Sequence, residues 1–498
     1  MRITQNFADR KYLKNSSKLL SNYTKSMLKI ESQMDYFRAS ENAINASKAL
    51  TVRKNLQDLD MYDSNLKLTK GLYEAAEQNL YTVANKVFIE VSTKLDQACN
   101  GTYSQEQLNI IAHELDQYAE SALTTLNADY AERRLFGGTN NSSPAFATLK
   151  EDDGVTDKLD PVTGHKIVTY NGVPVDDITA DGAHYMKRIT KAEYDAKIGT
   201  ADAGTVVRVA YDQGYDEEID QAEYNEILNG NGTIPADPDS VRTETRDVKT
   251  EVSADEYDPN DSAYSIEDGK YYKTETVTKY YKKNYRYYTG EAATEEEFNA
   301  SKDDGSIVKV DGKYIKTENV NGCKPIYVDI GLGIKYNAEG EVQVGTAVDV
   351  SMNGAKITGT GFTTVNSAVN SNYNKDDPFS KPSYDMQFSN NFVQLIYDAA
   401  DALRAGDVSR ANATIDLLDN SNTGILTEIT TLGAKYKSTE FYLEKDEEYK
   451  MSLQERQNDV EGCDMTQEIT NMNATQAAYN AMLQLSANVL PKSIFDFI

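Results

Sequence analysis

The sequence contains no tryptophan, only three cysteines and only ten prolines among its 498 residues. Cys99, Cys323 and Cys463 are far apart and odd in number, so neither a disulfide framework nor a structural zinc site is expected. No run approaches the roughly 18 consecutive apolar residues of a transmembrane helix. Charged residues within the first few positions leave no room for the apolar core of a cleaved signal peptide.

Positive charge is also in the minority, because the chain has 51 lysines and arginines but 79 aspartates and glutamates. The formal net charge is -28. A surface of this sign repels nucleic acid and anionic membranes, so neither is expected as a partner. Tyrosine, in contrast, is abundant, with 34 copies. Its ring packs while its hydroxyl stays hydrated, which suits half-exposed strands and the seams between helices.

Residues that could carry catalysis are missing from their usual patterns. His113 and Glu114 resemble the start of a zinc-protease helix, but the second histidine would have to stand at position 117, which is Gln117. His113 is therefore expected to be an exposed helix residue. The sequence has no phosphate-binding loop and no nucleophile elbow. We expect no enzyme activity, no catalytic residues, no cofactor and no metal site.

Proline and glycine divide the chain into three parts. Residues 5–134 and 389–490 contain no proline and few glycines, which permits long helices. Residues 139–388 hold nearly all the prolines and are rich in tyrosine, threonine and valine, which is typical of short strands and turns. The predicted fold is mainly α in the terminal regions, with long antiparallel helices and coiled-coil ends, around an inserted β-rich or α+β variable region.

Several helix boundaries can be placed within the terminal regions. A first long helix is predicted over 41–98, where Asn100-Gly101-Thr102 indicates a stop. Ser104 is a good N-cap for a second helix that runs to about Arg134. On the C-terminal side, helices are predicted over 389–405, 407–420 and 423–460.

Apolar residues at both ends recur at alternating steps of three and four, the a/d spacing of a coiled coil. The N-terminal series is Leu13, Ser16, Leu20, Tyr23, Met27, Ile30, Met34 and Phe37. The C-terminal series is Met465, Ile469, Met472, Gln476, Tyr479, Leu483, Ser486 and Leu490. A helix with so narrow an apolar stripe depends on a packing partner for most of its stability. The two ends are natural partners for each other or for neighbouring subunits, and an ordinary intramolecular bundle is an equally good interpretation.

Ten of these side chains form the predicted assembly and chaperone interface. They are Leu13, Leu20, Tyr23, Met27, Ile30, Met465, Ile469, Met472, Tyr479 and Leu483.

The middle contains a weak repeat in which a capped helical turn ends in an aromatic residue. Its copies are residues 189–194, 219–224, 252–257 and 293–298. Spacings of about thirty to forty residues suggest duplicated small α+β modules, although chance similarity in an acidic stretch is an alternative.

The predicted domains combine distant parts of the chain. They are a terminal coiled-coil axial domain (1–40 with 462–498), a helical bundle domain (41–138 with 389–461), and an inserted surface region (139–388) with repeats at about 185–320 and a strand segment at about 326–365.

Several motifs, in order along the chain, resemble the flagellin superfamily and, within it, the hook–filament junction proteins called hook-associated protein 3. They are Met1-Arg2-Ile3-Thr4-Gln5-Asn6, Ala46-Ser47-Lys48-Ala49-Leu50, Asn100-Gly101-Thr102, Leu135-Phe136-Gly137-Gly138 and Ser493-Ile494-Phe495-Asp496-Phe497-Ile498. The resemblance covers about residues 1–140 and 389–498.

This resemblance implies a structural adaptor of the bacterial flagellum that joins hook-associated protein 1 to the flagellin filament. It implies export through the flagellar type III channel to the outside of the cell, without a cleaved signal peptide. The implied partners are hook-associated protein 1, flagellin, further copies of the chain in a ring, and an export chaperone bound to the C-terminal helix. The implied location is the hook–filament junction.

Three alternatives stay open. The chain could be a flagellin filament subunit, which copy number would distinguish. It could be a surface adhesin that binds through the acidic insertion at 139–388. An enzyme within that insertion is a third class, and the missing zinc-ligand and nucleophile patterns argue against it.

Overall fold

The computed structural model describes residues 2–489 except 152–153, 155, 161–163, 199, 212–216, 231–235, 302–303, 339, 344, 370–373, 375–376 and 378. Leu490 and the segment 493–498, both used in the sequence analysis, lie outside these described residues. The chain divides into two compact units. Unit 1 is Met1–Leu68, Asp329–Thr346 and Thr439–Ile498, and unit 2 is Thr69–Val328 and Ala347–Ser438. The predicted three-domain division stays a prediction.

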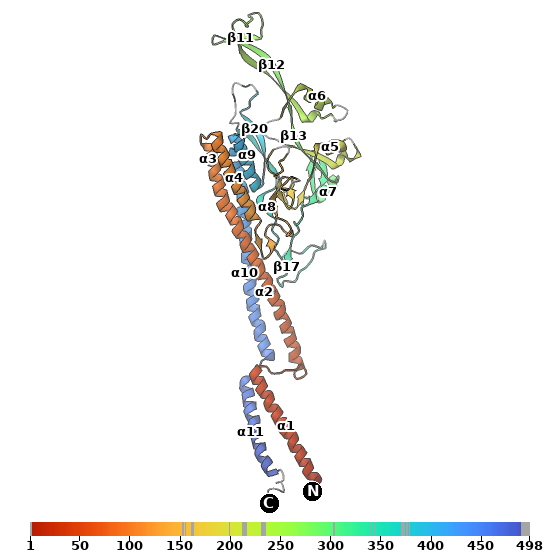
Figure 1. Cartoon of the computed structure of the whole chain (residues 1–498). Helices are drawn as coiled ribbons and strands as arrows, with labels where there is room; N and C mark the ends of the chain where they lie inside the picture. Colours follow the sequence, from red (N-terminus) through yellow and green to blue (C-terminus); the bar gives the residue numbers. More distant parts are fainter. Residues whose placement is uncertain are drawn as a thin grey trace. The chain divides into compact units, whose positions relative to one another are not determined.

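Unit 1 contains the helices of both chain ends. Helices α1 (Arg2–Ser32) and α11 (Met465–Val489) lie side by side (Figure 1). The first part of α2 (Ala43–Thr82) and the last part of α10 (Val408–Glu461) form the rest. Leu59 of α2 packs with Val52 and with Leu453 of α10 in a small buried cluster.

Two chain segments cross between the helix pairs of unit 1. The backbone N–H of Asp35 donates to Glu461 O at 2.8 Å, and that of Cys463 donates to Gln33 O at 3.0 Å. Gln33 has a φ of 59°, a left-handed conformation that ends α1. The predicted N-terminal seam is therefore wrong at Met34 and Phe37, which lie beyond the helix.

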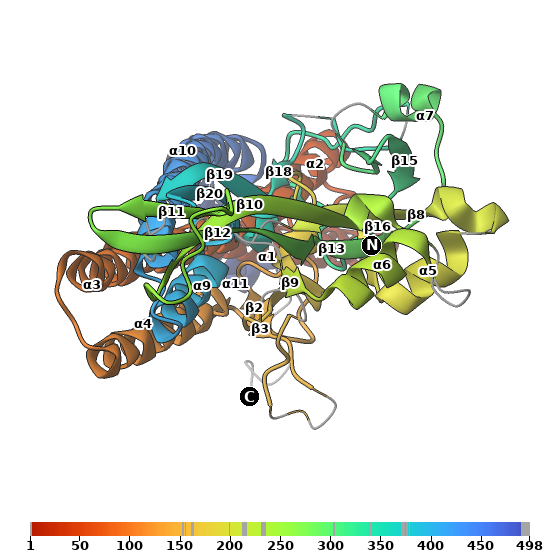
Figure 2. The same cartoon turned by 90° about the horizontal axis from the view of Figure 1, so that it is seen from above.

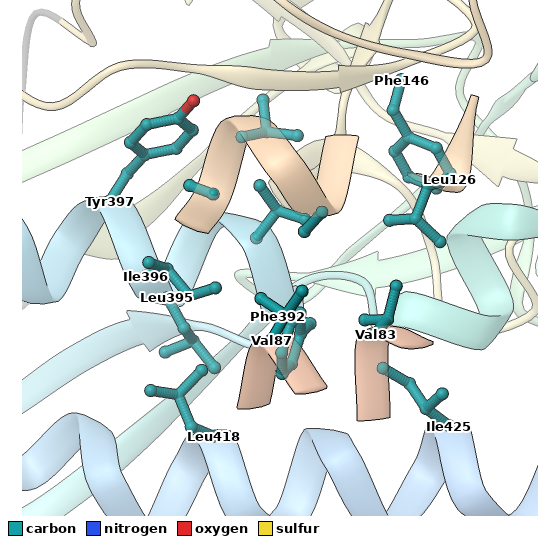
Figure 3. Packing of buried hydrophobic residues seen from close by; sticks show 14 of the residues in the cluster. Val83, Val87, Leu126, Phe146, Phe392, Leu395, Ile396, Tyr397, Leu418 and Ile425 are labelled. Atoms are coloured by element: carbon teal, nitrogen blue, oxygen red, sulfur yellow. The ribbon is translucent and has the colours of Figure 1, made fainter. Parts of the chain in front are cut away.

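Unit 2 contains the main hydrophobic core. Helix α2 continues into a π-helical turn (Val83–Val87) and α3 (Phe88–Asn100), followed by α4 (Gln105–Leu126) and α9 (Phe392–Arg404). Apolar side chains from these helices meet those of α10, as Figure 3 shows for Val83, Phe392 and Ile425. Ser104 and Gln107 form the capping box that starts α4.

Two predicted helix boundaries are wrong. Helix α4 ends at Leu126 rather than Arg134, because the chain turns into the hairpin of β1 (Asp129–Tyr130) and β2 (Arg133–Arg134). Helix α10 has no break at residues 420–424 and runs unbroken through Gly424. Buried Leu418, Ile425 and Leu432 continue one heptad stripe across that position, so core packing outweighs the low helix propensity of glycine.

The rest of unit 2 is built from small antiparallel sheets. Strand β13 (Asn284–Thr289) lies between β7 (Lys187–Ile189) and β8 (Val206–Tyr211). Strands β10 (Val241–Val252) and β12 (Lys270–Lys282) form a long ribbon (Figure 2). Helical terminal regions around a strand-rich insertion confirm the predicted fold class.

Shorter strands complete the unit. They are β3 (Phe146–Thr148), β4 (Val168–Tyr170), β5 (Val173–Pro174), β6 (His184–Tyr185), β9 (Glu217–Ile219), β11 (Tyr264–Glu267), β14 (Ile307–Val310), β15 (Lys313–Lys316), β16 (Glu318–Asn319), β17 (Tyr327–Val328), β18 (Val348–Asp349), β19 (Phe362–Val369) and β20 (Ser383–Ser389). A short helix α8 (Gly354–Thr358) precedes β19.

The four repeat segments share a packing contact. Three of them contain the short helices α5 (Lys191–Ile198), α6 (Gln221–Asn229) and α7 (Glu295–Ala300), whereas 252–257 contains a turn. In each copy the ring centroid of the repeat aromatic lies 4.8 to 5.1 Å from the ring centroid of a strand tyrosine. The pairs are Tyr194–Tyr287, Tyr224–Tyr280, Tyr257–Tyr271 and Phe298–Tyr314.

Candidate assembly surface

Two hydrogen bonds fix the register between α1 and α11. The Tyr12 hydroxyl donates to Met482 O at 3.1 Å, and the Ser26 hydroxyl donates to the Glu468 carboxylate at 2.7 Å. Residue numbers rise along α1 as they fall along α11, so the two helices are antiparallel. We call the facing rows of side chains the inner seam.

The inner seam follows steps of three and four on both helices. Its members are buried or half-buried, unlike most of their neighbours. They are Tyr12, Ser16, Leu19, Tyr23, Ser26 and Ile30 of α1, and Met465, Glu468, Met472, Thr475, Tyr479 and Met482 of α11. Four of these twelve side chains are polar and three more are tyrosines, so the pair buries little apolar surface and the seam alone stabilises it weakly.

Half of the ten predicted interface residues lie in the inner seam. Tyr23 and Ile30 of α1 and Met465, Met472 and Tyr479 of α11 are half-buried there. The structure thus brings these five together within one chain. Their predicted contact with other subunits or with a chaperone stays a prediction.

The other five predicted residues are exposed. Their exposed fractions are 64% for Leu13, 47% for Leu20, 52% for Met27, 41% for Ile469 and 46% for Leu483. We call this set the terminal strip.

The terminal strip occupies one side of the helix pair. Each of its members follows a seam residue by one position, as Leu13 follows Tyr12 and Ile469 follows Glu468. One position is a rotation of about 100° around a helix. Because α1 and α11 are antiparallel, rotation in the same sense on both helices leads to the same side of the pair. The five side chains therefore line one face.

An exposed apolar face of this kind marks an interaction surface. Burying one leucine or methionine side chain completely stabilises a complex by about 1.5–3 kcal/mol before the costs of association. We therefore take the terminal strip as the candidate assembly surface of the chain.

The charge around the terminal strip is positive, in contrast to the chain as a whole. Helix α1 carries seven lysines and arginines against two acidic residues, and Glu468 is the single charged residue of α11. Arg10 and Lys14 lie about 60° and 100° around the helix from Leu13. A partner surface for this face is expected to be acidic.

Charge pairs hold the crossing segments to the helices beside them. Lys29 lies 2.9 Å from Asp35, and Arg53 of α2 lies 2.7 Å from the nearly buried Glu461. Burial opposes the charge of Lys29, but the hydrogen bond to Asp35 and the negative charges of Asp35 and Glu468 together outweigh it and raise the pKa of Lys29. These contacts support the crossing backbone next to the inner seam.

Sequence reasoning missed half of the inner seam. Three residues of the inner seam, Tyr12, Leu19 and Met482, each precede an exposed member of the strip. Each pair of neighbours is an apolar doublet, at 12–13, 19–20 and 482–483. Such doublets at heptad spacing indicate a helix with two apolar faces, and they were a usable signal. Ser26, which is 6% exposed, gave no signal because its burial depends on the hydroxyl reaching Glu468.

The histidines take different environments. His113 is exposed on α4, as predicted. The His165 ring lies 2.8 Å from Asp401 and the His184 ring is hydrogen-bonded to Asp181. Within the part of the chain that the structure describes, no three His, Cys, Asp or Glu side chains are grouped to hold a metal ion. Among the described helices, none has the length and apolar character to span a bilayer.

Comparison with known structures returns flagellar proteins of low identity. FlgL from Xanthomonas campestris is 12% identical, with 81% of this chain and 98% of that chain covered and a TM-score of 0.32. Flagellar hook associated protein-3 from Legionella pneumophila is 11% identical, with 82% and 99% covered and a TM-score of 0.32. The flagellar junction protein FlgL from Legionella pneumophila is 10% identical, with 83% and 100% covered and a TM-score of 0.30.

No curated protein sequence matches the chain significantly. A family model does match, and it is described as the bacterial flagellin N-terminal helical region, over residues 3–141. These residues include α1, α2, α3 and α4, and with them one helix of the candidate assembly surface. Residues 3–141 are therefore similar to the N-terminal helical region of bacterial flagellins.

Proposed function

We propose that the chain is a structural component of the bacterial flagellum, an adaptor that joins the hook, through hook-associated protein 1, to the flagellin filament. The flagellin-type N-terminal region at residues 3–141 carries this proposal. The exposed terminal strip supports it, because an axial protein must present apolar helix surfaces to the subunits on either side.

Assembly follows from the balance of polar and apolar side chains in the helix pair. The inner seam holds α1 and α11 in register but buries little apolar surface. Docking of the terminal strip on a neighbour adds the missing burial, so each incoming subunit becomes ordered where it binds. A structural adaptor of this kind needs no catalytic residue.

The Leu-Phe-Gly-Gly segment resembles the corresponding segment of the hook–filament junction proteins, and it therefore favours the junction role over that of a filament subunit. In the structure this segment leaves the helices and enters the core of unit 2, where Leu135 and Phe136 are buried. Phe136 O accepts a 2.9 Å hydrogen bond from the Tyr170 hydroxyl. Gly138 has a φ of 63°, and a Cβ there would lie 2.0 Å from Gly322 O, so a side chain is excluded.

The proposed partners and export route rest on the resemblance to flagellar junction proteins. Copies of the chain would form a ring between hook-associated protein 1 and flagellin. Before export, the exposed apolar side chains of α11 would need cover, which an export chaperone on the C-terminal helix would provide. The chain would leave the cell through the flagellar type III channel and act at the hook–filament junction.

Electron microscopy of isolated flagella, labelled with an antibody to this chain, tests the proposal. An adaptor gives label confined to a short zone between hook and filament. Label along the whole filament would instead identify a filament subunit, and absence from flagella would overturn the proposal. Cells that lack the gene should assemble hooks without attached filaments.

A further inference from the structure

A groove in unit 1 is lined mostly by aromatic and aliphatic side chains. It lies between α2, α10 and the loop that follows Asp329, and its volume is about 400 Å³. Leu59 and Ile330 are buried at 5% and 3% exposure, whereas Tyr449 is 50% exposed. We call it the tyrosine groove after its three tyrosines. The aromatic and aliphatic residues among its lining are Leu59, Tyr62, Ile330, Leu332, Tyr442 and Tyr449.

Two contacts hold the loop side of the tyrosine groove against α2. Asn65 of α2 donates a 2.9 Å hydrogen bond to Asp329 O. Gly331 has a φ of 84°, and a Cβ there would lie 2.7 Å from the Tyr62 ring. The loop backbone therefore packs directly on the Tyr62 ring, and this contact shapes one wall of the groove.

One polar group in the groove is left unsatisfied. The Oδ2 atom of Asp446, which lines the groove, is buried and has no hydrogen-bond partner among the described residues. A buried carboxylate oxygen without a donor is costly. Burial raises the pKa of Asp446, and Asp63 adds to this rise, whereas the adjacent Lys445, which also lines the groove, lowers it without donating a hydrogen bond to Oδ2. A cationic side chain from a partner would supply the missing donor.

The surroundings of the groove are acidic. Residues 439–461 of α10 contain eight acidic side chains and three basic ones, and Asp58 lines the groove from α2. The occupant should therefore combine apolar side chains with positive charge, because complementary charge steers association and fixes register.

The chain itself carries a surface of that description. The terminal strip presents leucine, isoleucine and methionine side chains at heptad spacing, and α1 around it is strongly basic. The volume of the groove falls in the range of about 300–1,000 Å³ that is typical of binding pockets, which is ample for large aliphatic side chains. The apolar side chains and the positive charge of the terminal strip therefore match those expected of the occupant of the groove.

We propose that the tyrosine groove receives the terminal strip of a second copy of this chain. The inference rests on the proposed function, since it names the contact through which copies associate side by side in the junction. Leu20, at the centre of the α1 row, enters the groove between Tyr442 and Tyr449. Lys14 of the incoming copy, about 9 Å along α1 from Leu20, approaches Asp446. The contact is heterologous, because it joins two different surfaces of the chain, and a series of copies can therefore close into a ring.

Cross-linking between two purified full-length variants tests this proposal. In a background with the native cysteines changed to alanine, a Leu20→Cys protein is mixed with a separately tagged Tyr449→Cys protein and oxidised. The matched control replaces the second partner by Ile110→Cys on α4, which is 62% exposed. We expect at least tenfold more mixed dimer with Tyr449→Cys than with Ile110→Cys, and less dimer as salt screens the charges.

A second measurement uses the native sequence and avoids the cysteine changes. Unlabelled and ¹⁵N-labelled chains are mixed and joined with a zero-length carbodiimide reagent. Mixed-isotope peptides that link Lys14 to Asp446 or to Glu447 are the expected product. The inference is overturned if mixed products are absent in both measurements, or if they form equally at the control position. A chain that labels the hook–filament junction but gives no such product would leave the proposed function standing and remove only this contact.

Discussion

The Ser26 hydroxyl and the Glu468 carboxylate lie 2.7 Å apart across the inner seam of α1 and α11. This contact, with that of Tyr12 to Met482 O, sets which residues of the antiparallel pair face inward. It places Met27 and Ile469, the next residues on each helix, on the outside of the same face. The two series of apolar residues predicted from sequence are thus split between an internal contact and an external surface.

Aspartate substitutions separate these two surfaces. Leu20→Asp should leave the helicity of the free chain unchanged, because the side chain is exposed, and should block incorporation into flagella, because a carboxylate would be buried there. Tyr23→Asp should reduce the helicity of the free chain as well, since it lies in the inner seam. Circular dichroism and a motility assay measure both effects. Normal motility with Leu20→Asp would count against the terminal strip as an assembly surface.

The small core beside the tyrosine groove gives a prediction for stability. Leu59 is buried against Val52 and Leu453, so Leu59→Ala should lower the free energy of unfolding by about 2–5 kcal/mol. Met61, two residues away and 51% exposed, is the matched control, and Met61→Ala should change it by no more than about 0.5 kcal/mol. Urea denaturation followed by circular dichroism measures the difference. Equal effects of the two substitutions would mean that α2 and α10 do not pack as described.

Two glycines of one loop test the packing of that loop on α2. Gly331 and Gly340 have φ values of 84° and 83°, so alanine is strained at both. At Gly331 the added Cβ would also meet the Tyr62 ring, whereas at Gly340 nothing lies within 4 Å. Gly331→Ala should therefore destabilise the chain more than Gly340→Ala, by about 1–3 kcal/mol. Thermal unfolding gives the comparison, and identical losses would exclude the close contact with Tyr62.

The pair of His165 and Asp401 predicts a pH dependence of stability in unit 2. Burial opposes the charged imidazole, but the 2.8 Å hydrogen bond to Asp401 and the nearby Asp398 outweigh it and raise the pKa of His165. Burial likewise opposes the charged Asp401, yet His165 and Arg404 lower the pKa of that carboxyl.

The sign of the effect follows from these directions. The stability that His165 contributes is fully present below the unfolded pKa of about 6.5 and is lost as the pH rises through the higher folded value. The stability from Asp401 is present above about pH 4 and is lost on acidification. His165→Asn should thus destabilise by about 1–2 kcal/mol at pH 5.5 and by less at pH 9. Unfolding curves of both proteins at the two pH values measure this difference. A loss of stability that is independent of pH would show that the pair is not charged.

Much of the fold could be predicted because it follows from local rules. The absence of proline from residues 5–134 and 389–490 allowed the long helices, and the capping residue Ser104 fixed the start of α4. The end of α4 and the continuity of α10 could not be predicted, because both depend on tertiary packing. Gly424 stays helical since Leu418, Ile425 and Leu432 are all held by the same core.

The candidate assembly surface shows the same limit. The heptad spacing of Leu13, Leu20 and Met27 predicted an apolar row on α1. Spacing alone could not tell whether that row faces α11 or solvent, because Tyr12 and Leu19 give an equally regular row one position earlier. The choice depends on the hydrogen bonds of Tyr12 and Ser26, which are formed only when α1 and α11 meet.

The tyrosine groove was not predicted at all. Its residues come from three segments far apart in the sequence, at Leu59, Ile330 and Tyr449 among others. Gly331, with a φ of 84°, bends the loop that forms one wall of the groove. The contact of that bend with Tyr62 required the structure.

Thiol accessibility at position 20 tests most directly whether the terminal strip becomes buried when the chain joins the flagellum. A Leu20→Cys variant, with Cys99, Cys323 and Cys463 changed to alanine, is labelled with a maleimide, once as the purified chain and once in intact hook–filament structures, with denatured samples as the reference for full reactivity. We predict rapid labelling of the free chain and protection in the assembled structure. Equal labelling in the two states would contradict the account.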